Sequence, residues 1–169
     1  MKIAMIIAKE NFRDEEYLQP KDIFLKAGFL VETFSTSTGT AKGMLGAKAE
    51  VDKNIKDLKV EDYDAIVFVG GSGSSCYWDD PLAHKIAKEA VSKDKVLAAI
   101  CIAPVTLARA GVLQGKKSTV YPSEATQLKQ LKANYTGKDV EVDGKIVTAS
   151  GPHAAKQFAE KIKEMLLKK

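Results

Sequence analysis

A cysteine at the end of an apolar run is a first candidate for chemistry in this sequence. Cys101 closes the apolar segment 96–101, and helix-forming residues follow it at once. A strand that turns into a helix from Ala103 would place this cysteine at the strand's carboxyl end, where open α/β sheets bind ligands. The backbone amides that open such a helix, beginning with Ile102, favour an anion and lower the pKa of a thiol. A reactive thiolate and a small buried hydrophobic residue are therefore both open interpretations of Cys101.

Two other loops contain residues that could act with this cysteine. Gly70 and Gly71 end the apolar segment 65–70, and glycines let backbone amides approach a ligand closely, as an oxyanion hole requires. Glu15 and Glu16 follow the first apolar segment and reach the same sheet edge. Acids in a first helical turn are ordinarily partners of the helix dipole, so we expect Glu15 to face solvent and to titrate normally. If Glu16 is the partner of the thiol, we expect it to be buried with a raised pKa, without a cationic neighbour in the local sequence.

The chain has two histidines and one further cysteine to consider. His84 lies among lysines on the charged side of a predicted helix, and we expect it to be exposed. His153 opens the last helix, where the fold could bring it to the pocket. Cys76 lies in the glycine loop. It could be a second thiol near the site, a resolving cysteine for Cys101, or a residue that only packs the loop. No His, Asp and Glu cluster has the spacing of a metal site, so neither a metal nor another cofactor is expected.

The elements that must position these residues alternate between strand and helix. Short apolar segments rich in Val, Ile and Ala are typical of strands buried on both faces of a parallel sheet. The predicted strands cover 3–8, 29–35, 65–70, 96–101 and 117–122, with a hairpin over 140–150. The predicted helices cover 14–27, the segment from Pro81 with Asp80 as its cap, 123–133 and 153–169, while 36–52 is read as loops or a small edge hairpin. This order predicts a doubly wound, three-layer α/β sandwich with a mostly parallel central sheet.

Composition limits the classes of function. The 169 residues predict one domain over 1–169, and the net charge of +4 comes from lysines spread along the chain. Without a basic stripe that contains aromatic residues, we expect no nucleic-acid partner. The sequence has neither a signal segment nor about 18 consecutive apolar residues, so we expect a cytoplasmic protein without a membrane partner. Its two cysteines lie in unlike contexts, which favours neither disulfides nor structural zinc.

Several motifs in this order resemble the ThiJ/PfpI superfamily. They are "ENFRDEEYLQP", "VFVGG", "AAICIAPVTLARAGVLQGKK", "VYP" and "VEVDGKIVTASGP", and they extend over essentially the whole chain. The resemblance implies the flavodoxin-like fold of class I glutamine amidotransferases and a homodimer. It places the family's elbow nucleophile on Cys101 and its buried glutamate on Glu16. The backbone donors around the sulfur fall on Gly70, Gly71 and Ile102.

The sequence also departs from the family's patterns. In the peptidase branch a histidine directly follows the cysteine, but Ile102 stands here. The glutamate that this branch takes from a neighbouring subunit aligns with Ser75, and a histidine of another branch aligns with Tyr121. A Cys-His-Glu peptidase triad therefore cannot be assembled in the usual way.

Three functions remain, all centred on Cys101. The first is a stress-response enzyme of glyoxalase or deglycase kind, in which Cys101 and Glu16 act on small reactive carbonyls or their adducts. The second is a redox sensor or chaperone-like protein in which an oxidant modifies Cys101. The third is an intracellular cysteine peptidase, which the isoleucine after the cysteine disfavours.

Overall fold

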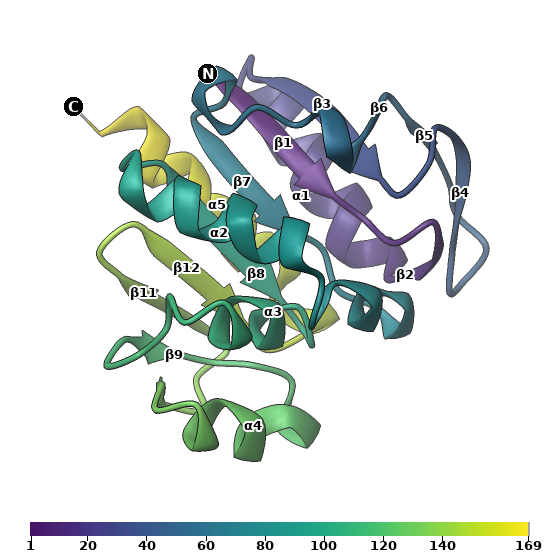
Figure 1. Cartoon of the computed structure of the whole chain (residues 1–169). Coiled ribbons are helices and arrows are strands. Elements are labelled where there is room, and N and C mark those ends of the chain that lie inside the picture. Colours follow the sequence, from purple (N-terminus) through teal and green to yellow (C-terminus); the bar gives the residue numbers. More distant parts are fainter. Residues whose placement is uncertain (169) are drawn as a thin grey trace.

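A seven-stranded sheet forms the middle layer of the computed structural model, which describes residues 1–168 (Figure 1). Its strand order is β11-β12-β8-β7-β1-β3-β6, and only β11 runs antiparallel to its neighbour. The strands are β1 (Lys2–Ile6), β3 (Leu30–Ser35), β6 (Lys53–Asn54), β7 (Ala65–Phe68), β8 (Val96–Ile100), β11 (Val140–Asp143) and β12 (Ile146–Ala149). The predicted mostly parallel sheet is confirmed.

Helices cover both faces of this sheet. They are α1 (Asp14–Lys26), α2 (Pro81–Ser92), α3 (Pro104–Arg109), α4 (Ala125–Gln130) and α5 (Ala155–Leu167). Side chains alternate between the two faces of a strand, so Ile3 and Met5 of β1 share one core with α1 and α5. Ala4 and Ile6 share the other core with α2 and α3. The doubly wound α/β sandwich is therefore confirmed as the fold (Figure 1).

Two small sheets lie outside the central one. The segment 36–52 forms a hairpin of β4 (Gly39–Gly43) and β5 (Lys48–Val51), and β2 (Glu10–Phe12) pairs with β4. The expected hairpin is present, but it belongs to this separate sheet and not to an edge of the central one. The other small sheet pairs β9 (Lys117–Ser118) with β10 (Asn134–Tyr135).

The predicted strand over 117–122 and helix over 123–133 are both too long. Only Lys117–Ser118 is extended into a ladder. Beyond it, the N–H of Thr119 bonds to the side chain of Thr148, and Pro122 has no N–H to donate. The helix α4 ends at Gln130, where the chain turns back towards β10.

Short 3₁₀ turns complete the described residues. They are η1 (Ile55–Asp57), η2 (Val60–Asp62), η3 (Ser72–Tyr77), η4 (Pro122–Glu124) and η5 (Pro152–Ala154). No helix in residues 1–168 combines the length and the apolar character that a membrane crossing needs.

Candidate functional site

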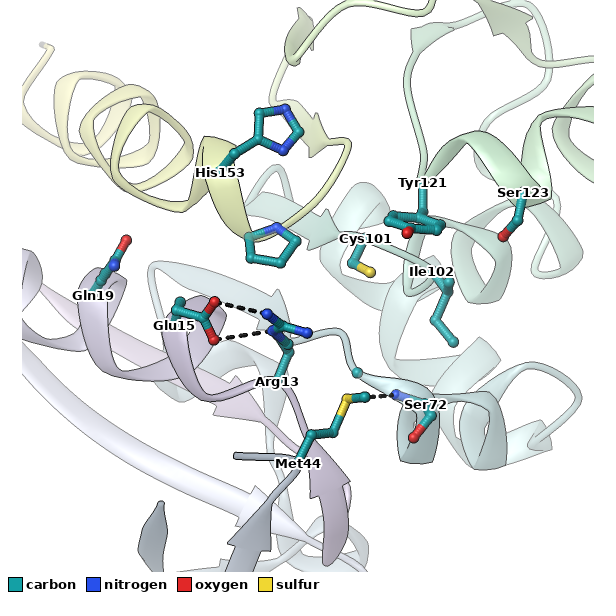
Figure 2. A pocket seen from close by; sticks show the side chains of 12 residues that line it. Arg13, Glu15, Gln19, Met44, Ser72, Cys101, Ile102, Tyr121, Ser123 and His153 are labelled. Atoms are coloured by element: carbon teal, nitrogen blue, oxygen red, sulfur yellow. Dashed lines mark hydrogen bonds and ion pairs between the residues drawn. The ribbon is translucent and has the colours of Figure 1, made fainter. Parts of the chain in front are cut away.

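A cavity of about 760 Å³ opens where β7 and β8 end and α1 begins (Figure 2). Its wall combines apolar, hydroxyl and charged groups from segments far apart in the sequence. The lining residues are Arg13, Glu15, Gln19, Met44, Gly71, Ser72, Cys101, Ile102, Tyr121, Ser123, Pro152 and His153. This volume accommodates a small organic ligand.

Cys101 lies at a strained corner of the backbone on the cavity wall. Its φ of 65° falls in the left-handed region, which non-glycine residues rarely adopt. The surroundings hold this conformation, because the N–H of Cys101 donates to Ala149 O at 2.9 Å and its carbonyl accepts from Tyr121 N–H at 2.8 Å. The side chain is only 8% exposed, and its sulfur faces the cavity (Figure 2). The turn from strand to helix lies where the sequence predicts it, although α3 begins at Pro104, one residue later than expected.

Glu16 is fully buried in the first turn of α1. Among residues 1–168, neither of its carboxyl oxygens has a hydrogen-bond partner of good geometry. The pKa of Glu16 is raised to about 8, and burial is the main cause. The neighbouring Cys101 thiol and the charge of Arg13 lower this pKa, but by less. The expected burial and raised pKa are confirmed. The expectation that no cation adjoins Glu16 is wrong, because Arg13 precedes it on the same loop.

Gly70 keeps Glu16 and Cys101 close to each other. A Cβ at this position would collide with Glu16 Oε1, with the Cβ of Cys101 and with the carbonyl of Ile100. The Gly70 amide lowers the pKa of Glu16, whereas the amides of Gly71 and Ile102 lower the pKa of Cys101. The amides of Gly71 and Ile102 therefore favour a negative charge on Cys101.

Burial, followed by the charge on Glu16, raises the pKa of Cys101 to about 12. The amides of Gly71 and Ile102 lower it, but by less. The expectation of a lowered thiol pKa is therefore wrong for this geometry, since desolvation outweighs the amide donors of a short helix start. Near neutral pH both Glu16 and Cys101 hold their protons, and the two groups titrate as a coupled pair.

Arg13 and Glu15 form an ion pair on the opposite wall (Figure 2). Arg13 Nε donates to Glu15 Oε1 at 3.0 Å, and Nη2 donates to Oε2 at 2.9 Å. The hydrogen bonds from Arg13 lower the pKa of Glu15. The expectation that Glu15 faces solvent and titrates normally is wrong, because the sequence analysis overlooked the arginine two positions before it.

Asp14 is a second residue that the sequence analysis overlooked. Its buried carboxylate accepts the N–H of Leu45 at 2.9 Å and that of Ala47 at 2.7 Å. These bonds fix the turn between β4 and β5 against the start of α1. Met44 in this turn then reaches the cavity, where its sulfur accepts the N–H of Ser72 at 3.4 Å (Figure 2).

The remaining candidates lie around the rim or outside the cavity. Tyr121 and His153 both line it, but His153 Nε2 lies 3.1 Å from Asp139 Oδ1 at the exposed edge. Cys76 is exposed and lines a different cavity, so the structure does not bring it to Cys101. His84 is half-buried, with Nε2 2.6 Å from the carbonyl of Trp78, which corrects the expected exposure. Residues 1–168 contain no group of three or more His, Cys, Asp or Glu side chains arranged for a metal ion.

Comparisons with known proteins agree with this arrangement. The model of the DJ-1/PfpI family matches residues 1–165. An uncharacterized protein of Methanocaldococcus jannaschii is 46% identical over 160 residues, which are 93% of this chain and 78% of that one. A deglycase of Pyrococcus horikoshii is 32% identical over 152 residues, covering 90% of this chain and 91% of that one.

A solved structure extends the likeness to three dimensions. The ThiJ/PfpI domain protein of Brachyspira murdochii superposes with a TM-score of 0.96 at 34% identity, over 98% of this chain and 95% of that one. The resemblance found in the sequence is thereby confirmed. The chain belongs to the DJ-1/PfpI family.

Proposed function

We propose that this protein acts on small reactive carbonyl compounds or their adducts, with Cys101 as nucleophile and Glu16 as the group that transfers the proton. One observation carries the proposal: the Cys101 sulfur faces a small-molecule cavity beside the buried carboxyl group of Glu16, whose pKa is raised to about 8. The relative from Pyrococcus horikoshii that is named a deglycase supports the same class of chemistry.

The first step would be the addition of the thiol to the carbonyl carbon. A carbon–sulfur bond forms, and the π electron pair of the carbonyl moves to its oxygen. The amides of Gly71 and Ile102, which already act on the sulfur, are placed to stabilise the developing negative charge. The sulfur loses one proton and the oxygen gains one, with Glu16 transferring it, so the product is a neutral thiohemiacetal.

Methylglyoxal tests this proposal. Its thiohemiacetal can isomerise by moving a hydrogen from the aldehyde carbon to the ketone carbon, which gives a thioester that water hydrolyses to lactate and the free thiol. We expect purified protein to form lactate from methylglyoxal, and Cys101→Ser to form none. Turnover that does not exceed the Cys101→Ser control would reject the carbonyl function.

A redox sensor is the second candidate, because it needs no general base: Ile102 follows Cys101 in the sequence, and the His153 of the cavity wall lies 3.1 Å from Asp139 Oδ1. Peroxide would add one oxygen to the sulfur with loss of water, and a second peroxide would give the sulfinic acid. The amides of Gly71 and Ile102 would then hold the new charge. Intact-mass spectra after graded peroxide should show two added oxygens on Cys101 at low oxidant, and an unmodified Cys101 would reject this candidate.

A peptidase is the third candidate and has the least support. The apolar side chain of Ile102 stands at the cavity where a histidine would be needed, and His153 bonds to Asp139 instead.

We also propose a homodimeric assembly and one domain over 1–169. Sedimentation equilibrium tests the dimer, which a monomeric mass at micromolar concentration would reject.

A further inference from the structure

We propose that Arg13 makes the cavity selective for carbonyl compounds that also carry a carboxylate group, with 2-oxo acids as the simplest ligands of this class that could add to the Cys101 thiol. This inference rests on the proposed carbonyl function and names its substrate class. It comes from the geometry of the Arg13 guanidinium, which the first step at Cys101 does not use.

A guanidinium group has two edges that can each hold a carboxylate through two parallel N–H bonds. Glu15 occupies the edge formed by Nε and Nη2, at 3.0 and 2.9 Å. The second edge, formed by Nη1 and the other N–H of Nη2, has no hydrogen-bond partner within residues 1–168. Figure 2 shows this end of Arg13 directed away from Glu15 and into the cavity.

The backbone fixes Arg13 relative to the reacting sulfur. Arg13 N–H donates to Gly70 O at 2.9 Å, and a Cβ on Gly71 would collide with Arg13 N. The loop that carries Arg13 is therefore packed directly against the glycines whose amides act on Glu16 and Cys101. A ligand whose carbonyl carbon lies at the sulfur would thus share the cavity with the Arg13 guanidinium, which faces it from another wall (Figure 2).

One cationic side chain of the wall is available to an anion at this position. Among the described residues that line the cavity, Arg13 is the one arginine or lysine. Its charge reaches the site, because it interacts with those of Cys101 and Glu16. Glu15 balances the net charge and holds the guanidinium in place, so recognition would depend on directed hydrogen bonds more than on long-range attraction.

Alkylation of Cys101 tests the anion site without any need for turnover. In a Cys76→Ser background, the rate with iodoacetate is divided by the rate with iodoacetamide, which has nearly the same shape but no charge. The fraction of thiolate affects both rates equally and cancels in this ratio. We expect Arg13→Gln to lower the ratio about tenfold, the equivalent of about 1.4 kcal/mol, and Arg13→Lys to lower it less.

Arg109 provides a matched control, because it is the other arginine of the chain and lines a separate cavity. Arg109→Gln removes the same charge and should leave the ratio unchanged. Equal ratios in the unsubstituted protein, Arg13→Gln and Arg13→Lys would overturn the proposal. Circular dichroism of each variant verifies that the fold persists, and the iodoacetamide rate verifies that Cys101 remains reachable.

Pyruvate and pyruvamide then test the substrate class, because they differ in the carboxylate alone. Pyruvate should protect Cys101 from iodoacetamide at concentrations about tenfold lower than pyruvamide, and Arg13→Gln should abolish this difference. Equal protection in the unsubstituted protein would overturn the proposed class. A high ratio of the iodoacetate rate to the iodoacetamide rate without any carbonyl turnover would reject the proposed function but support the anion site. The two failures are therefore distinguishable.

Discussion

Glu16 and Cys101 are buried next to each other, so ionisation of either group is unfavourable. Burial raises the pKa of both groups, and a charge on either one makes a charge on the other less favourable. A protonated Glu16 is therefore the state that permits a thiolate, whereas an ionised Glu16 opposes it. The amides of Gly71 and Ile102 support the thiolate, but they do not overcome its desolvation.

Replacement of Glu16 should make Cys101 more acidic. Glu16→Gln cannot ionise, so the charge that raises the pKa of Cys101 is lost. We expect the midpoint of Cys101 alkylation against pH to move down by about one pH unit or more. Iodoacetamide rates across the pH range, with Cys76 replaced by serine, measure this midpoint.

Glu16→Leu is the companion variant, because it removes both the charge and the hydrogen-bonding capacity. Its midpoint should lie above that of Glu16→Gln, since the side chain at position 16 then offers no polar group to the thiolate. A midpoint that is identical in the unsubstituted protein and in both variants would show that Glu16 does not control the thiol.

Gly70 should tolerate no side chain. In Gly70→Ala the added Cβ would meet Glu16 Oε1, the Cβ of Cys101 and backbone oxygen. We expect a loss of about 1–3 kcal/mol in the free energy of unfolding, together with a changed alkylation profile, both measurable in urea titrations and labelling. Gly151→Ala is the control, because its Cβ would lie 3.4 Å from Tyr121 Cδ1, an ordinary contact. Equal stability of both variants would contradict the close packing at Gly70.

At the scale of elements, Asp14 joins α1 to the hairpin of β4 and β5. Its carboxylate accepts two backbone N–H groups of the turn between these strands. Asp14→Ala would leave both donors unpaired, and we expect the free energy of unfolding to fall by about 2–4 kcal/mol. Asp14→Asn keeps one acceptor oxygen and should lose less.

Hydrogen exchange separates this local effect from a general loss of stability. Asp14→Ala should increase the exchange rates of the Leu45 and Ala47 amides more than it increases those of the β1 amides. Unchanged protection of these two amides would show that the carboxylate does not hold the turn.

The elements with strong local signals were the ones that the sequence predicts well. The apolar segments of β1, β7 and β8 are buried on both faces, and the Asp80 side chain caps α2 as expected, accepting the N–H of Leu82. The segment 117–122 has the composition of a strand, but only Lys117–Ser118 pairs with a strand, β10. Beyond it, the N–H of Thr119 bonds to the Thr148 side chain and that of Tyr121 to the Cys101 carbonyl. Composition cannot reveal which partner a backbone group finds.

The site was predictable in its position and less so in its electrostatics. The corner at Cys101 follows from the order of elements, and the burial of Glu16 was expected from the resemblance. The raised pKa of Cys101 depends on how completely the surrounding residues exclude water from its thiol. No local sequence pattern indicates this degree of burial. The pair of Arg13 and Glu15 has a visible signal, namely opposite charges two positions apart at the start of a helix. The interpretation of such acids as partners of the helix dipole concealed it.

At the scale of the whole molecule, two buried or bridged carboxyl groups give opposite pH dependences. Hydrogen bonds from Lys2, and to a smaller extent from Lys53 and Tyr63, together lower the pKa of Glu32 to about 2. The stability that Glu32 contributes is present above its unfolded pKa of 4.5 and is lost only as the pH falls towards 2. Glu32 therefore does not change the stability between mildly acidic and mildly alkaline pH.

Glu16 should make the protein less stable as the pH rises through neutrality. Its pKa is about 8 in the folded chain and 4.5 when unfolded, so the folded state binds more protons between these values. The contribution of Glu16 is then fully present below pH 4.5 and is lost as the pH rises towards 8, with an upper limit of about 1.4 kcal/mol per pH unit. Glu16→Gln lacks this titration, so the stability difference between the unsubstituted protein and Glu16→Gln should shrink or reverse over this range. Urea unfolding of both proteins at about pH 5, 6, 7 and 8 measures that difference, and two parallel curves would mean that Glu16 is already ionised in the folded chain at low pH.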